Sequence, residues 1–178
     1  EIAVSRKYST QLMLEKGINE ILKYGYNCSL NHIDVSKVTI MEGLFSSEVN
    51  NFECYFEEDE YKIFNIEKWN GDISKWDTSN VKDMSFMFQN SFFNGNISKW
   101  NTSNVLLMAC MFKGSKFNKS ILNWKVSKVR NMCCMFSDSI FNKNISNWQI
   151  SNNTDTTFML DNSIISKKNL PKILKALY

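Results

Sequence analysis

Five cysteines are the side chains in this 178-residue chain with the most evident chemistry. Cys110 and Cys134 stand 24 residues apart, which is also the spacing of four tryptophans, so they occupy one position of a repeat. Repeats about 5 Å apart on a strand side would allow a disulfide, whereas the spacing on a helix side would be too wide. The alternative, which we favour, is two unbridged thiols packed as small apolar side chains. The odd cysteine count argues against a complete internal set of disulfides and favours a reducing compartment.

Candidates for catalysis and metal binding are few. The single histidine, His32, has no acidic or cysteine partner at a fixed spacing, so it is a poor general base or zinc ligand and is expected at the surface. The chain contains no nucleophile elbow, phosphate-binding glycine loop or zinc-protease motif. The acidic run Glu57, Glu58, Asp59 and Glu60 lacks the alternating ligands and glycine of a calcium loop. We therefore expect no enzyme activity, no cofactor and no metal.

Composition restricts the class of partner only slightly. A hydrophobic content of 43% suits one domain with a continuous core, and a net charge of +3 gives no argument for nucleic acid or an anionic membrane. Lys75 and Lys99 give way to Asn123 and Asn147 in later repeats, so no sustained basic track accompanies the aromatic residues and no nucleic-acid partner is expected. No apolar stretch is long enough to cross a bilayer, and no signal peptide is visible. Since the chain starts at Glu1, the missing signal decides nothing about its compartment.

A 24-residue repeat must position all of these residues. About ten positions recur in register over at least three copies, which is the mark of a stacked architecture. A degenerate copy over 33–45 is offset by 43 residues, which is one period plus a 19-residue insertion at about 46–64. The main aligned positions are Ile73, Ile97, Ile121 and Ile145; Trp76, Trp100, Trp124 and Trp148; Met84, Met108 and Met132; Phe88, Phe112 and Phe136; and Phe93, Phe117 and Phe141.

Each repeat predicts two short elements. The residues around 73–76 favour a short strand, and the apolar spacing over 81–88 favours a helix of about two turns. That helix would leave Phe86, Cys110, Cys134 and Phe158 on its outer face, so either the segment is not a regular helix or something covers an apolar strip. Asn94, Asn118 and Asn142 predict a ladder of side chains that satisfy backbone groups.

The predicted fold is an α/β solenoid of about five stacked 24-residue units. Short parallel strands would line one face, with short helices or turns on the other. We expect a helical N-terminal cap at 1–29, the solenoid at 30–160 with its insertion, and a helical C-terminal cap at 161–178. In the last segment Pro171 would start a helix, and Ile173, Leu174 and Leu177 would form its apolar face.

The segment 73–88 reads I-S-K-W-D-T-S-N-V-K-D-M-S-F-M-F, and 97–112 is nearly the same. This motif resembles the BspA-like leucine-rich repeat family, in a branch first noted in mycoplasmas as a domain of unknown function. The resemblance covers residues 30–160 and implies a leucine-rich-repeat-like solenoid. Members occur on bacterial surfaces and have been linked to adhesion to host proteins or cells. It implies no catalytic or binding residue for this chain, because the family motif contains none.

The expected function is a non-catalytic binding or adhesion module. It would present its strand face to a protein or glycan on a host or neighbouring cell, at the cell surface or as a secreted protein. One alternative is a scaffold with unbridged thiols in the cytoplasm or delivered to a host-cell interior; another is a coat unit that self-associates through the solenoid ends. Expected contact residues are the non-core strand positions and the acidic insertion: Ser74, Lys75, Ser98, Lys99, Asn123, Ser146, Asn147, Glu57, Glu58, Asp59 and Glu60.

Overall fold

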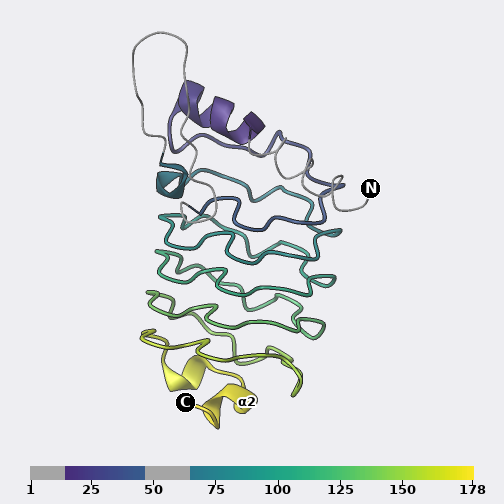
Figure 1. The fold of residues 1–178 in the computed structure, drawn as a ribbon, viewed down its shortest axis with the longest axis vertical. Helices are drawn as coiled ribbons and strands as arrows, with labels where there is room; N and C mark the ends of the chain where they lie inside the picture. The colour runs from purple at the N-terminus through teal and green to yellow at the C-terminus, as the bar shows by residue number, and fades with distance from the viewer. Residues whose placement is uncertain (1–14, 47–64) are drawn as a thin grey trace.

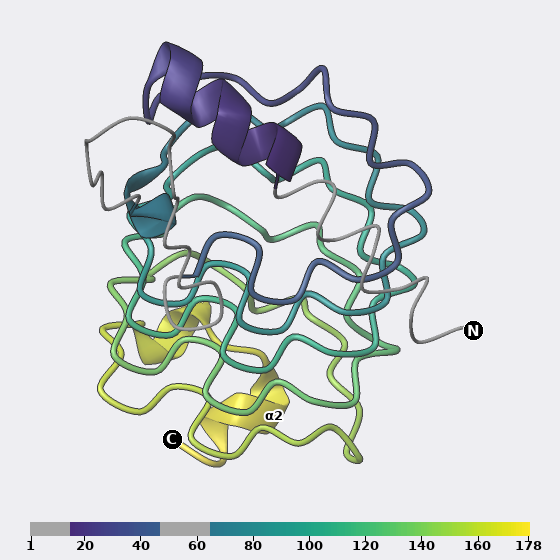
Figure 2. The same ribbon diagram turned by 45° about the horizontal axis from the view of Figure 1, so that its top comes forward.

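The chain winds into a column of coils that lie one above another (Figure 1). The structure is a computed structural model, and it describes residues 15–46 and 65–178. A helix over 15–24 lies at one end of the column, and the 3-10 helix η1 (Ile66–Lys68) lies near it. The 3-10 helix η2 (Lys167–Asn169) and the short helix α2 (Lys172–Lys175) lie at the other end. The tilted view in Figure 2 shows that successive coils follow the same path.

The predicted α/β solenoid is wrong, because the described residues contain no β-sheet. Pairing between coils is limited to isolated parallel bridges, such as those of Asp83 with Leu107 and of Leu107 with Asn131. The segment predicted as a strand is a turn, in which the Trp76 backbone N–H donates to the Ile73 carbonyl at 3.2 Å. The Asp72 carboxylate accepts the Ser74 backbone N–H at 2.8 Å, and this local bond favours a turn over an extended strand.

The predicted helix over 81–88 is also wrong. Phe86 has a φ of 59°, and its equivalents Cys110, Cys134 and Phe158 have φ values of 54–55°, so a left-handed residue interrupts every copy of the segment. Its backbone N–H groups bond across to the next coil: the Phe86 N–H donates to the Ala109 carbonyl at 2.8 Å. For Phe86 and its equivalents the sequence left two alternatives, an irregular segment or a helix whose outer apolar strip is covered. The irregular segment is correct. Left-handed geometry is uncommon for residues other than glycine, and here the bonds between coils hold it in place.

The core lies where the repeat predicts it. Val81, Met84, Met87 and Phe88 are fully buried although they do not form a helix. Rings at equivalent positions stack along the column: Phe88 on Phe112 at 5.6 Å and Trp100 on Trp124 at 6.4 Å between centroids. Each repeat tryptophan also donates its indole N–H to a carbonyl of the preceding coil, as Trp124 does to Ile97 at 3.1 Å. Each coil thus completes the packing of its neighbour.

The degenerate upstream copy packs as the first of these coils. The Met41 backbone N–H donates to the Asp83 carbonyl at 2.8 Å, and Phe45 stacks on Phe88 at 5.4 Å. Its equivalence to the residues around 81–88 is therefore confirmed. Most of the predicted insertion, at 47–64, lies outside the described residues.

The predicted asparagine ladder is confirmed. The Asn70 side-chain oxygen accepts the Asn94 backbone N–H at 2.7 Å. Asn94 does the same for Asn118 at 2.9 Å, and Asn118 for Asn142 at 3.0 Å. The ladder continues one step further, where the Ser166 N–H donates to the Asn142 side chain at 2.9 Å.

Both ends of the column carry helical segments with buried apolar residues. Ile18 and Ile21 of the first helix are buried, and Leu174 of α2 is fully buried next to Pro171. Leu177 was predicted on the same apolar face but is 63% exposed, because α2 ends before it. The predicted domain limits remain predictions. Among the residues described, no helix has the length and apolar character to span a membrane.

Candidate functional site

The predicted contact residues of the repeats lie on turns between each isoleucine and tryptophan. Lys75 and Lys99 are exposed, and their turns repeat at the same place in successive coils. The neighbouring serines help to build these turns: the Ser98 backbone N–H donates to Asn96 at 3.1 Å, and that of Ser146 to Asn144 at 2.9 Å. The equivalent positions that the structure brings into this column are Ser74, Lys75, Ser98, Lys99, Asn123, Ser146 and Asn147. The predicted acidic contacts, Glu57, Glu58, Asp59 and Glu60, lie outside the described residues.

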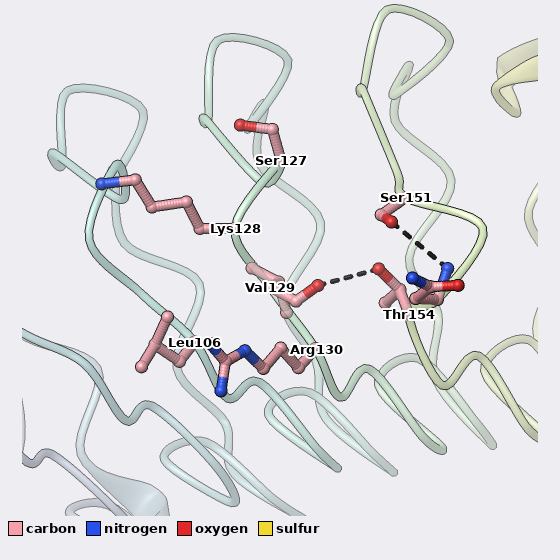
Figure 3. Close-up of a pocket in the computed structure, with 8 residues that line it drawn as sticks. Leu106, Ser127, Lys128, Val129, Arg130, Ser151 and Thr154 are labelled. Atoms are coloured by element: carbon pink, nitrogen blue, oxygen red, sulfur yellow. Dashed lines mark hydrogen bonds between the residues drawn. The ribbon is translucent and has the colours of Figure 1, made fainter.

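Two adjoining hollows lie elsewhere on the column, beside the bridges between coils. Leu106 and Arg130 line both. The first hollow is about 520 Å³, and its other lining residues are Thr39, Ile40, Lys82, Asp83 and Leu107. The second is about 330 Å³ (Figure 3), and its other lining residues are Ser127, Lys128, Val129, Ser151, Asn153 and Thr154. We call the surface formed by these two sets of residues the ladder face.

Backbone hydrogen bonds place the ladder-face side chains in register. The Leu106 N–H donates to the Lys82 carbonyl and the Arg130 N–H to the Leu106 carbonyl, both at 2.8 Å. Val81 points into the core and is fully buried, so the next residue in this extended stretch points outward. Each coil therefore contributes one outward side chain, and successive coils contribute lysine, leucine and arginine.

The second hollow has a polar, internally bonded wall. The Thr154 hydroxyl donates to the Val129 carbonyl at 2.8 Å, and the Asn153 backbone N–H donates to the Ser151 hydroxyl at 3.2 Å (Figure 3). Lys128 lies at its rim, where its ammonium donates to the Asn104 side chain of the preceding coil at 3.0 Å. These bonds hold the wall in one geometry.

Positive charge predominates on the ladder face. Lys82, Lys128 and Arg130 line the two hollows, and the only acidic residue among the lining residues is Asp83. One Asp83 carboxylate oxygen already accepts the Ser85 backbone N–H at 2.9 Å. Leu107 adds an apolar contact surface and is 37% exposed. The face therefore presents cations beside an apolar surface.

A second group of reactive side chains lies on the turns that carry the left-handed residues. The cysteines among the described residues form no disulfide, so Cys110 and Cys134 are unbridged. Burial and the adjacent Cys134 thiol raise the pKa of Cys133 to about 11. Within the part of the chain that the structure describes, no group of three or more histidine, cysteine or acidic residues is placed to hold a metal ion. His32 is exposed, and its imidazole lies 3.6 Å from the Glu20 carboxylate.

The predicted contact segment around 73–76 lies before the positions that bridge the coils, such as Asp83 and Leu107, so the prediction does not include the ladder face. A signal for it was present in the repeat. Val81, Val105 and Val129 keep one residue type, as do Met84, Met108 and Met132, but the position after each valine changes from Lys82 to Leu106 to Arg130. A position that varies between invariant core positions faces solvent and is free to serve a partner.

Comparison with known proteins places the chain in a family. No curated protein and no solved structure matches it. One family model, described as Mycoplasma protein of unknown function, DUF285, matches residues 58–173. This match confirms the predicted mycoplasma-type family and leaves the narrower BspA-like leucine-rich repeat assignment unconfirmed. Because the match covers more than half of the sequence, the chain belongs to the family of Mycoplasma proteins of unknown function, DUF285.

Proposed function

We propose that the chain is a non-catalytic binding module that presents its ladder face to an extended, acidic protein or glycan partner. The observation that carries this proposal is the pair of adjoining hollows that share Leu106 and Arg130. In keeping with the adhesion roles linked to BspA-like proteins, the partner would belong to a host or neighbouring cell. The module would then act at a cell surface or as a secreted protein.

The dimensions of the ladder face favour a polymer over a small molecule. From Thr39 to Thr154 it crosses five coils, and four steps of about 4.8 Å give a length of about 19 Å. An extended peptide covers this length with about six residues at 3.3 Å each. Small-molecule sites enclose most of their ligand in a pocket lined by apolar groups. A strip of cations with the adjacent Leu106 and Leu107 matches the charge and shape of a chain.

The location of the module has a second candidate. The cysteines that the structure describes carry thiols, as expected of an interaction scaffold in a reducing cell interior. The same ladder face would serve that role. Titration of the thiols in the native protein separates the two locations, because five reactive thiols on unfolding without reductant would favour the cell interior. Self-association through the column ends stays a further candidate, because apolar side chains such as Tyr24 and Leu177 are exposed in the two end segments.

Binding to simple polymers tests the proposal directly. The probes are immobilised heparin, hyaluronan and polyglutamate, with uncharged dextran as the reference, measured by surface plasmon resonance. We expect binding to at least one acidic polymer, weakening as salt is raised, and none to dextran. A Lys82→Ser/Arg130→Ser variant should weaken that binding at least tenfold.

A matched control removes the same charge from the turns that carry the predicted contact residues. The Lys75→Ser/Lys99→Ser variant also loses two exposed cations and should keep its affinity within about twofold of the unmodified protein, because the ladder face is unchanged. Equal weakening in the two variants would show that only net charge matters. That result, or a lack of binding to all three acidic polymers, would contradict the proposal.

A further inference from the structure

Cys133 and Cys134 are neighbours in sequence whose thiols face each other. Their sulfur atoms lie 3.5 Å apart, and both residues are partly exposed. They begin the turn over 133–138. Cys110 occupies the position of Cys134 in the preceding coil, because its backbone N–H donates to the Cys133 carbonyl at 2.8 Å.

The backbone of this cysteine pair is held on all sides. The Cys133 N–H donates to the Asn131 side-chain oxygen at 2.9 Å, and the Cys134 N–H to the Thr157 carbonyl at 2.9 Å. The Cys134 carbonyl accepts the Ser137 N–H at 3.1 Å, and the Cys133 carbonyl is engaged by the preceding coil. Every backbone donor and acceptor of the pair is therefore bonded. The turn fixes the two thiols without any ligand.

The sulfur separation suits one bridging atom better than a direct bond. A disulfide needs its sulfurs about 2.05 Å apart, so the pair would have to close by roughly 1.5 Å against its bonded backbone. An atom that bonds two thiolates at about 2.3 Å with a tetrahedral angle, as zinc does, holds them about 3.8 Å apart. The observed 3.5 Å lies close to that second distance.

We propose that Cys133 and Cys134 form a preorganised dithiol site for a soft electrophile that bonds both sulfurs through one atom, with trivalent arsenicals as the chemical class. With an arylarsenoxide, two sulfur–arsenic bonds form and the arsenic–oxygen bond breaks. The two thiol protons leave with that oxygen as water. Arsenic stays trivalent, so the step needs neither an oxidant nor a reductant.

The raised pKa of Cys133 makes the site selective. The thiolate is the reactive form, so reagents that attack the Cys133 sulfur alone react slowly near neutral pH, because its pKa is raised to about 11. A reagent that takes both sulfurs gains a second bond whose formation is intramolecular, with the partner thiol already in place. The two cysteines thus favour a two-bond ligand over a one-bond ligand.

Phenylarsine oxide tests the site on the intact chain. One equivalent should add one phenylarsenic group, seen by intact mass, which a small dithiol removes and an equal concentration of monothiol does not. Trypsin then locates the group. The fragment 131–143 contains Cys133 and Cys134 and no other cysteine, whereas Cys110 lies on the fragment 100–113. We expect the group on 131–143 alone; two fragments joined through arsenic, or a group on another fragment, would overturn the proposal.

Serine variants give a second, independent readout. Cys133→Ser and Cys134→Ser should each weaken phenylarsine oxide binding at least about a hundredfold, because each removes the intramolecular second bond. Cys110→Ser and Cys28→Ser are the controls and should bind as the unmodified protein does. Loss of binding in Cys110→Ser would refute the adjacent pair as the site. The fragment assignment uses the unmodified chain, so it stands even if a variant fails to fold.

Discussion

The asparagine ladder can be broken at one step without touching the apolar core. Asn118 is half-buried; its side-chain oxygen accepts the Asn142 N–H at 3.0 Å, while its own N–H donates to Asn94. Asn118→Ala removes only the acceptor. The Asn142 N–H is then left between two coils without its partner, because its position is fixed by the bonds around it.

The expected cost follows from that orphaned donor. A buried donor without a partner costs about 1–3 kcal/mol. For a domain of 150–250 residues each kcal/mol shifts the melting temperature by about 2–4 °C, so a loss of about 2 kcal/mol lowers it by roughly 4–8 °C. Asn118→Asp is the matched control. It keeps an acceptor oxygen in the same place and should cost clearly less than alanine at neutral pH.

Amide hydrogen exchange gives the local readout. In Asn118→Ala the Asn142 amide should exchange about 10–100-fold faster, as expected for 1.4–2.8 kcal/mol of lost protection. The Arg130 amide, which bonds to the Leu106 carbonyl on another side of the column, should be much less affected. If the Asn142 amide exchanges as before, or if alanine and aspartate cost the same, the asparagine ladder does not stabilise the stack through the hydrogen bond from Asn142 to Asn118.

Three further predictions test other parts of the stack. Trp124→Phe keeps a ring in the stack but loses the indole N–H bond to Ile97 and part of the buried area, so urea unfolding should show a loss of about 1–3 kcal/mol. Phe136→Ala empties a fully buried ring position and should cost about 3–5 kcal/mol, whereas Phe158→Ala, at a residue 58% exposed, should cost under about 1 kcal/mol; equal losses would contradict the assigned core. The Thr157 side chain and backbone N–H lower the pKa of Asp155 below the usual aspartate value of about 3.9. The Asp155 carboxylate therefore stabilises the fold above the usual aspartate pKa, and this stabilisation is lost as the pH falls through the lowered pKa. Asp155→Asn should flatten the acidic part of the pH–stability curve. An unchanged curve would refute the stabilising role of Asp155.

The 24-residue period predicted the register and the core of this protein but not its local conformation. Equivalent residues of a repeat must pack on one another, so the tryptophan and phenylalanine columns follow from spacing alone. The local conformation of 81–88 does not follow from spacing, because the apolar spacing of Val81, Met84 and Met87 fits a helix as well as a hydrogen-bonded turn. Only the left-handed geometry of Phe86 distinguishes the two, and phenylalanine gives no local signal for it.

A neighbouring position of the repeat did carry a sequence signal for left-handed geometry. Asn90, Gly114, Asp138 and Asn162 are equivalent residues, and all four have positive φ. Glycine, asparagine and aspartate are the types that adopt this geometry most readily, so the column of these residues indicates a recurring left-handed turn. At Gly114 the choice is also steric, because an added Cβ would meet the Asn90 side chain. Two left-handed residues four positions apart cannot belong to one α-helix.

The packing of the coils limits where residues for a partner could lie in a stack of this kind. The interior of each coil is fixed by its neighbours, and turn residues such as Asn94 are fixed by backbone bonds, so neither can vary to suit a partner. Outward positions between two core residues carry no such constraint. Lys82, Leu106 and Arg130 are in this class, and they line the ladder face. Under the proposed function, outward positions that change between repeats are therefore better candidates for a binding face than positions that recur.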